Sequence, residues 1–170
     1  MKYLHRGFGL IAGLCLWTYL YAASDASDPI QYEVNLWGRL HQEAKRDADA
    51  KVESLLLDGG SPKDRDTGEA GVLIARRAAT ICGWLRNEND YARAEKVAKR
   101  ALKLIAPYAE KSDDAKIERL YWEALLLGEY VDRKKDALEL VAKGRKLAPE
   151  DGRFVDLNRE YSKAVAAFGH

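Results

Sequence analysis

The sequence predicts an all-α protein body, and three observations support this fold class. Apolar residues return every three to four positions in the segments after residue 29, which is the period of a helix and not that of a strand. No segment alternates polar and apolar residues for long enough to suggest a sheet. The four prolines stand at positions 29, 62, 107 and 149, where helices would begin or end. We therefore expect one helical domain over residues 29–170.

Residues 1–26 form a separate segment, either a signal sequence or an uncleaved membrane anchor. Lys2, His5 and Arg6 precede an uncharged run of 17 residues from Gly7 to Ala23. A positive stretch followed by an apolar one is the layout of a secretory signal. The positive charges place the N-terminus in the cytoplasm and the body outside, which in a Gram-negative bacterium is the periplasm.

Features of both outcomes, cleavage and retention, are present in this segment. Ser24 and Ala26 are small residues that suit cleavage after Ala26. Retention is favoured by an aromatic belt at the outer end of the run and by a glycine pair that lets another helix approach. These anchor residues are Gly9, Gly13, Trp17, Tyr19 and Tyr21. Because the run is at the short limit for a membrane span, both outcomes stay open, with retention slightly preferred.

The first helix of the body is expected from Pro29 to Leu57, with Asp28 as its N-cap. A polar loop from Asp58 to Asp66 follows, because it contains two glycines and a proline. The inward stripe of this helix is predicted to be Ile30, Val34, Trp37, Ala44, Ala48, Val52 and Leu55.

Five more helices are expected after this loop, each with one apolar face. The second begins near Thr67, and the third spans residues 90–111. The fourth follows the capping residue Ser112, and the fifth spans residues 133–148. The sixth starts near Glu150 and is apolar on one side only, which suits a cap at the end of a helical stack. Its apolar side comprises Phe154, Leu157, Tyr161, Ala164, Val165 and Phe168.

The second to fifth helices carry motifs of a repeat. The segment from Asp90 to Ala94, followed by Ala101-Leu102 and by Pro107, resembles the second half of a tetratricopeptide repeat (TPR). A later segment offers Ala137, Gly144 and Pro149, and the residues from Ala101 to Pro107 align with those from Lys143 to Pro149. The resemblance implies stacked antiparallel helical hairpins with small residues at close contacts. The two prolines are 42 residues apart, whereas the family period is about 34.

Composition and motifs argue against several classes of function. Without the first 23 residues the chain has 26 basic and 27 acidic residues, which argues against a basic face for nucleic acid or anionic lipid. No metal-ligand or phosphate-loop spacing is present. Cys82 is expected to be a small core residue, and His41 to be packed or partly exposed and not catalytic. We expect no cofactor, no metal site and no catalytic residues.

Two features suggest a surface for a partner. Trp122, Leu126 and Tyr130 form a second apolar line on the fourth helix, which either packs on a neighbouring helix or receives a partner. Arg77 lies on the apolar face of the second helix, seven residues before Trp84, and either extends to the edge of the core or lines a groove.

The sequence therefore favours a non-enzymatic protein–protein interaction scaffold. We expect an accessory or assembly subunit of a membrane or envelope complex, held by the N-terminal helix. The first alternative is a soluble periplasmic peptide-binding or chaperone-like module with the signal cleaved, and the second is a hydrolase. This expected function rests on analogy with the TPR fold and on the absence of a recognisable catalytic motif in the sequence.

Overall fold

The computed structural model describes residues 29–58, 69–109 and 111–168. Within these residues it contains seven α-helices, one short π-helix and no strand, so the predicted all-α class is confirmed. The chain divides into two compact units, Met1–Gly38 and Arg39–His170. The described part of the first unit is residues 29–38, and the fold below is that of the second unit. The expected signal or anchor segment lies outside the described residues.

Where one long helix was predicted, the chain forms two, α2 (Pro29–Lys45) and α3 (Asp49–Leu57). The break is at Asp47, whose φ of 54° lies in the left-handed region that aspartate tolerates better than most residues. The Ala48 amide donates a 3.1 Å hydrogen bond to the Glu43 carbonyl and closes the turn. The prediction of one helix over residues 29–57 was therefore wrong.

The predicted inward stripe of this region holds in part. Ala44, Val52 and Leu55 are buried, as expected. Ile30 and Val34 are instead 75% and 38% exposed, so the start of the stripe was wrong. The buried apolar residues of α2 are instead Leu36, Leu40 and Ala44.

Helices α5 (Ala70–Asn87) and α6 (Tyr91–Ile105) form a hairpin, because only three residues connect them and they pack against each other. Asp90 caps α6, where its Oδ1 accepts a 3.3 Å hydrogen bond from the Arg93 amide. Small side chains fill the contact and let the two backbones approach. The buried alanines of this hairpin are Ala70, Ala75, Ala78, Ala79, Ala94, Ala98 and Ala101.

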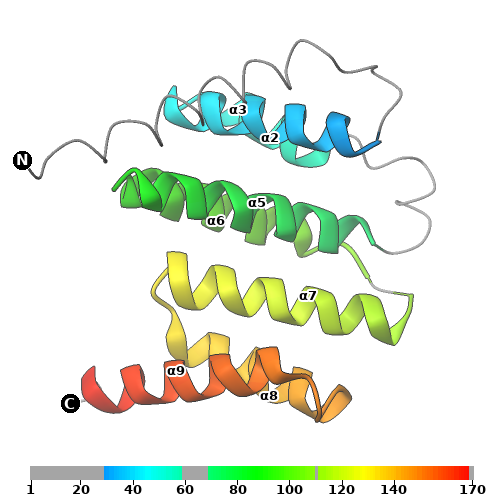
Figure 1. Cartoon of the computed structure of the whole chain (residues 1–170), viewed down its shortest axis with the longest axis vertical. Coiled ribbons are helices and arrows are strands. Elements are labelled where there is room, and N and C mark those ends of the chain that lie inside the picture. Colours follow the sequence, from blue (N-terminus) through cyan, green and yellow to red (C-terminus); the bar gives the residue numbers. More distant parts are fainter. Residues whose placement is uncertain (1–28, 59–68, 110, 169–170) are drawn as a thin grey trace, which may run out of the picture. The chain divides into compact units, whose positions relative to one another are not determined.

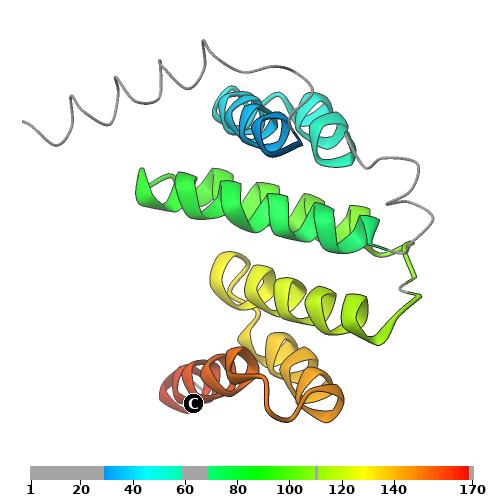
Figure 2. The same ribbon diagram turned by 45° about the vertical axis from the view of Figure 1, so that its right-hand side comes forward.

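The second half of the fold contains α7 (Asp113–Leu125), the π-helix η1 (Leu126–Tyr130), α8 (Lys134–Leu147) and α9 (Gly152–Phe168). Ser112 caps α7 as predicted, since its Oγ accepts a 3.1 Å hydrogen bond from the Ala115 amide. The predicted fourth helix does not stay α-helical to its end, because η1 adds a residue to its last turn. Helix α7 packs on α5 and α8, and α9 packs on α8. Figures 1 and 2 show these helices in successive layers, with α5 and α6 in one layer, then α7, then α8 and α9.

Two aromatic side chains of α9 pack directly against glycines. A Cβ atom at Gly144 would lie 2.7 Å from Cδ1 of Phe154, and one at Gly128 would lie 2.6 Å from the hydroxyl oxygen of Tyr161. Both aromatic residues are fully buried. The predicted role of Gly144 in a close helix contact is therefore confirmed.

The buried residues of α6 and α8 follow the same spacing. Ala94, Ala98 and Ala101 are buried in α6, and Ala137, Val141 and Gly144 are buried in α8. By burial, Ala101 corresponds to Gly144, although the sequence alignment pairs it with Lys143, which is exposed. The alignment was therefore wrong by one residue, because it matched the closing prolines and not the packing positions.

Candidate functional site

Partly exposed aromatic and charged side chains gather where α7 meets the start of α9. We call this group the α7 patch, and its members are Glu118, Tyr121, Trp122, Asp151 and Arg153. Helix α7 supplies the first three at helical spacing, and the turn before α9 and its first residues supply the other two. The patch depends on the packing of α7, α8 and α9, since the two groups are about 30 residues apart in sequence.

The aromatic side chains of the α7 patch are held in place by their neighbours. The rings of Tyr121 and Trp122 lie 5.0 Å apart at an angle of 70°, and Tyr121 also meets buried Phe154 edge-on at 6.2 Å. The Trp122 Nε1 donates a 3.2 Å hydrogen bond to Oε2 of Glu118, one turn earlier. These contacts restrict the rotamers of both aromatic residues while part of each side chain stays exposed.

Arg153 joins the charged part of the α7 patch to its aromatic part. Its guanidinium lies 4.7 Å from the centre of the Tyr121 ring and pairs with Asp151 at 2.8 Å and with Glu118 at 2.6 Å. These pairs raise the pKa of Arg153, with Asp151 as the larger cause and Glu118 as the next. Conversely, the hydrogen bond from Arg153 lowers the pKa of Asp151. Arg153 is therefore fixed above the Tyr121 ring at a partly exposed surface, and this arrangement suits the binding of another molecule by surface contacts.

Of the five residues proposed from the sequence for a partner, only Trp122 belongs to the α7 patch. Leu126 is fully buried, so the apolar line on the fourth helix turns into the core there. Tyr130 is half-buried, and burial is the main cause that raises its pKa. Trp84 is also half-buried and meets His41 edge-on at 5.5 Å. These residues therefore do not form one continuous surface.

Arg77, the fifth of these residues, is only 1% exposed. Its Nη1 donates hydrogen bonds to the carbonyl oxygens of Leu56, at 3.4 Å, and of Asp58. These carbonyls belong to the C-terminal end of α3, where a helix has acceptors without internal partners and a partial negative charge. Arg77 is therefore a buried residue that connects α5 to the end of α3.

The sequence indicated part of the α7 patch but missed most of its members. The four-residue spacing of Glu118 and Trp122 was visible, but only the tryptophan was considered. Tyr121 contacts buried Phe154, so one side of its ring belongs to the core. Arg153 and Asp151 carry no local sign of their role, because only the packing of α9 brings them to α7.

A second charged cluster joins α3 to α6, and we call it the α3–α6 ladder. Arg100 pairs with Glu53 at 2.9 Å and with Asp49 at 3.0 Å. Lys96 pairs with Asp49 at 3.1 Å and with Asp47 at 3.3 Å, and Arg93 also pairs with Asp47 at 3.3 Å. The acidic residues thus come from α3 and the turn before it, and the basic residues all come from α6.

The α3–α6 ladder predicts that acid weakens the attachment of α3. The hydrogen bonds from Arg100 and then Lys96 lower the pKa of Asp49 below its usual value. A lowered pKa in the folded state gives stability that is present above the unfolded pKa, about 4, and is lost as the pH falls further. We expect the stability of the wild type to fall below that pH, with lower amide protection factors in α3, and Asp49→Asn to flatten this dependence.

Urea unfolding and hydrogen exchange across an acidic pH series measure the effect. Glu139→Gln removes an exposed carboxylate outside the ladder and should leave the pH dependence unchanged. Equal slopes for the wild type and Asp49→Asn would show that the ladder does not hold α3.

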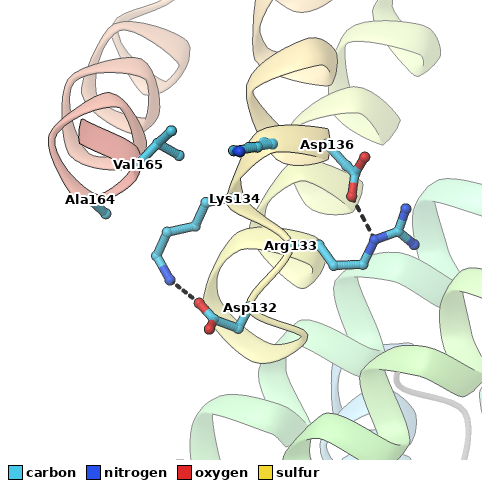
Figure 3. A pocket seen from close by; sticks show the side chains of 7 residues that line it. Asp132, Arg133, Lys134, Asp136, Ala164 and Val165 are labelled. Atoms are coloured by element: carbon cyan, nitrogen blue, oxygen red, sulfur yellow. Dashed lines mark hydrogen bonds and ion pairs between the residues drawn. The ribbon is translucent and has the colours of Figure 1, made fainter. Parts of the chain in front are cut away.

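A shallow hollow of about 460 Å³ lies between the start of α8 and the end of α9. Figure 3 shows Lys134 reaching Asp132 and Arg133 reaching Asp136, while Ala164 and Val165 line the opposite side. The Arg133–Asp136 pair measures 2.6 Å. Four of its five charged lining residues pair with one another, so Lys135 supplies the net charge that the hollow offers to a ligand.

The thiol and the imidazole of this unit both lie in packed surroundings. Burial raises the pKa of the Cys82 thiol, whose Sγ lies 3.2 Å from the Ala94 carbonyl oxygen. His41 has an 18% exposed side chain, and its Nε2 lies 3.4 Å from Oε1 of Glu88. Among the described residues, no three His, Cys, Asp or Glu side chains are grouped so that they could hold a metal ion.

Comparison of the chain with family models, with curated proteins and with solved structures finds no match. Within the described ranges, no helix is both long enough and apolar enough to cross a membrane. The five residues from Gly9 to Tyr21 that were assigned to a membrane anchor lie outside those ranges.

Proposed function

We propose that this protein is a non-enzymatic interaction scaffold with TPR-like helical hairpins, and that a partner protein docks on the α7 patch. The observation that carries the proposal is the clustering of Trp122, Tyr121 and Arg153 in fixed contact on a partly exposed surface. Trp, Tyr and Arg are the residue types most enriched among those that dominate protein–protein binding energies. Helical stacks commonly use such extended surfaces to hold other proteins.

The contacts within the α7 patch support a role in binding. Association costs free energy when mobile side chains become ordered at an interface. Here the Trp122 indole is bonded to Glu118 and the Arg153 guanidinium to Glu118 and Asp151 before any partner arrives. These side chains therefore lose less conformational freedom on docking than mobile surface side chains would.

For the setting of this scaffold we propose a membrane or envelope complex, with the body on the periplasmic side and residues 1–26 as anchor. This part of the proposal rests on the positive residues and the apolar run at the N-terminus. N-terminal sequencing of the native protein tests it. A chain that begins at Met1 supports the anchor, whereas one that begins after Ala26 supports the soluble periplasmic module.

The docking site is tested by affinity capture from detergent-solubilised membranes, comparing the wild type with Trp122→Ala. Truncating a side chain that dominates an interface lowers the binding free energy by at least about 2 kcal/mol, which corresponds to roughly thirtyfold weaker binding. We therefore expect a protein that co-purifies with the wild type to be lost from the variant.

Tyr91→Ala is the matched control, because Tyr91 is an aromatic residue that is 58% exposed on α6, outside the patch. It should retain the co-purifying protein. Circular dichroism and thermal unfolding must show that both variants are folded. Equal capture by Trp122→Ala and the wild type would place the docking site elsewhere.

A further inference from the structure

The α7 patch carries more negative than positive charge. Among its members, Glu118 and Asp151 are acidic and Arg153 is basic. Both carboxylates pair with the same guanidinium, at 2.6 and 2.8 Å, so together they more than offset its charge. A partner that approaches the patch therefore meets a net negative charge, although a basic side chain lies in its centre.

A further carboxylate extends this negative charge along α7. Asp114 precedes Glu118 by four residues, and Glu118 precedes Trp122 by four, so the three side chains form one row on the helix. Asp114 is exposed, and in the described part of the chain it pairs with no basic side chain. Helix α8 packs beside α7, but none of its basic side chains that the structure describes pairs with Asp114, Glu118 or Asp151. The row therefore ends in a carboxylate that the fold leaves unmatched.

Trp122, at the other end of this row, suits contact with a cation. A positive charge is attracted to the face of an aromatic ring, and tryptophan attracts it more strongly than tyrosine or phenylalanine does. Because Oε2 of Glu118 accepts the 3.2 Å hydrogen bond from Nε1, a carboxylate at the edge of the indole adds to this attraction. Arg153 stacks instead on Tyr121, 4.7 Å from the ring centre. The partly exposed Trp122 ring therefore offers a place for a cation from another molecule.

We propose that the α7 patch binds a basic segment of the partner protein, and that an arginine of this segment stacks on the Trp122 ring. The carboxylates of Asp114 and Glu118 attract such a segment, whereas they repel an acidic one. Asp114 and Trp122 are separated by a rise of roughly 12 Å along the helix. In an extended segment, two basic residues four positions apart span about this distance and point to the same side. The inference rests on the proposed docking at the α7 patch and adds the chemistry of the partner.

The test uses the isotope-labelled full-length chain in a non-ionic detergent and three flexible glycine–serine peptides. Each peptide carries two identical residues four positions apart, which are arginine, glutamine or glutamate. Two-dimensional NMR spectra follow the indole N–H signals during the titrations. We expect the Kd of the arginine peptide to be at least about tenfold lower than that of the glutamine peptide, and the glutamate peptide not to bind. The arginine peptide should shift the signal of Trp122 more than that of Trp84, which lies on α5.

The decisive variant is Asp114→Asn combined with Glu118→Gln, which should weaken binding of the arginine peptide at least about tenfold. Glutamine still accepts a hydrogen bond from the indole, so the change removes charge and keeps that contact. The control is Glu95→Gln combined with Asp132→Asn, which removes two carboxylates of exposed ion pairs outside the patch. It should bind as the wild type does. Equal loss in both double variants would indicate general ionic attraction and overturn the proposal.

Trp122→Leu tests the stacking separately from the charge. Leucine keeps an apolar side chain but removes the aromatic face, so the preference for the arginine peptide over the glutamine peptide should shrink. The remaining preference should disappear as the ionic strength rises, because exposed charges are screened by salt. A preference as large as that of the wild type would show that no arginine stacks on this ring.

Failure of this inference can be distinguished from failure of the docking site itself. The inference is overturned if the wild type shows no saturable binding of the arginine peptide, or binds the glutamine or glutamate peptide as tightly. If the protein captured from membranes is nevertheless lost with Trp122→Ala, the α7 patch docks a partner of other chemistry. If capture does not depend on Trp122, the docking proposal fails, and this inference fails with it.

Discussion

Replacing Gly144 with valine is expected to lower the free energy of unfolding by at least about 3 kcal/mol. A Cβ at this position already overlaps the Phe154 ring, and valine adds two methyl groups to it. The ring has little room to move, because Phe154 is fully buried and meets Tyr121 edge-on. Alanine should destabilise the protein less, because its better helix propensity offsets roughly 1 kcal/mol of the free-energy cost of the overlap.

Urea unfolding followed by circular dichroism measures this effect. Gly152→Ala is the matched control, because a Cβ at that position meets nothing within 4 Å. It should leave stability unchanged or raise it by up to about 1 kcal/mol. A Gly144→Val variant as stable as the wild type would show that α8 and α9 do not approach as closely as described.

Phe154→Leu provides an internal check on the same contact. Alone it should destabilise, since a smaller side chain leaves part of the notch at Gly144 empty. Combined with Gly144→Ala, it should cost clearly less than the sum of the two single changes, because each relieves the strain or void left by the other. Additive effects would mean that the two residues are not coupled.

Replacing Arg77 with methionine is expected to destabilise the protein by about 3 kcal/mol. The change removes buried, charge-assisted hydrogen bonds to the carbonyls of Leu56 and Asp58, and each such bond contributes roughly 1.5 to 3 kcal/mol. It also leaves acceptors at the end of α3 without their donor. Methionine keeps most of the length of the side chain, so the effect reports mainly the lost donors.

The adjacent residue provides the control, since Arg76 is exposed on the same helix. Arg76→Met should change stability by no more than about 0.5 kcal/mol. Hydrogen exchange adds a local readout, because α3 should lose amide protection before α5 and α6 do. Similar results for the two methionine variants would contradict the structural role of Arg77.

The parts of this fold that depend on local chemistry could be read from the sequence. Ser112 was predicted to cap the fourth helix, and its Oγ accepts a hydrogen bond from the amide three residues later. The apolar faces of the later helices also follow from residue spacing alone, and Phe154 and Tyr161 are buried as predicted.

Sequence reasoning missed two kinds of feature: local backbone changes without a strong sequence signal, and contacts between residues that are distant in the chain. The left-handed conformation of Asp47 has no strong local sign, since aspartate is compatible with a helix interior as well. Tyr161 packs where η1 departs from the α-helical path, and no sequence rule places that extra residue. In the candidate site, Trp122 was recognised by its spacing, but Arg153 is brought beside it only by the packing of α9.

The aromatic residues of α9 fix its position along its own axis. Phe154 and Tyr161 are seven residues apart, which is about two helical turns, or roughly 10 Å. Each ring occupies a space that only a residue without a side chain leaves open, one in α8 and one in η1. A slide of α9 by one turn would carry both rings against side chains at once. The last helix therefore cannot shift its register while it stays packed on α8 and η1.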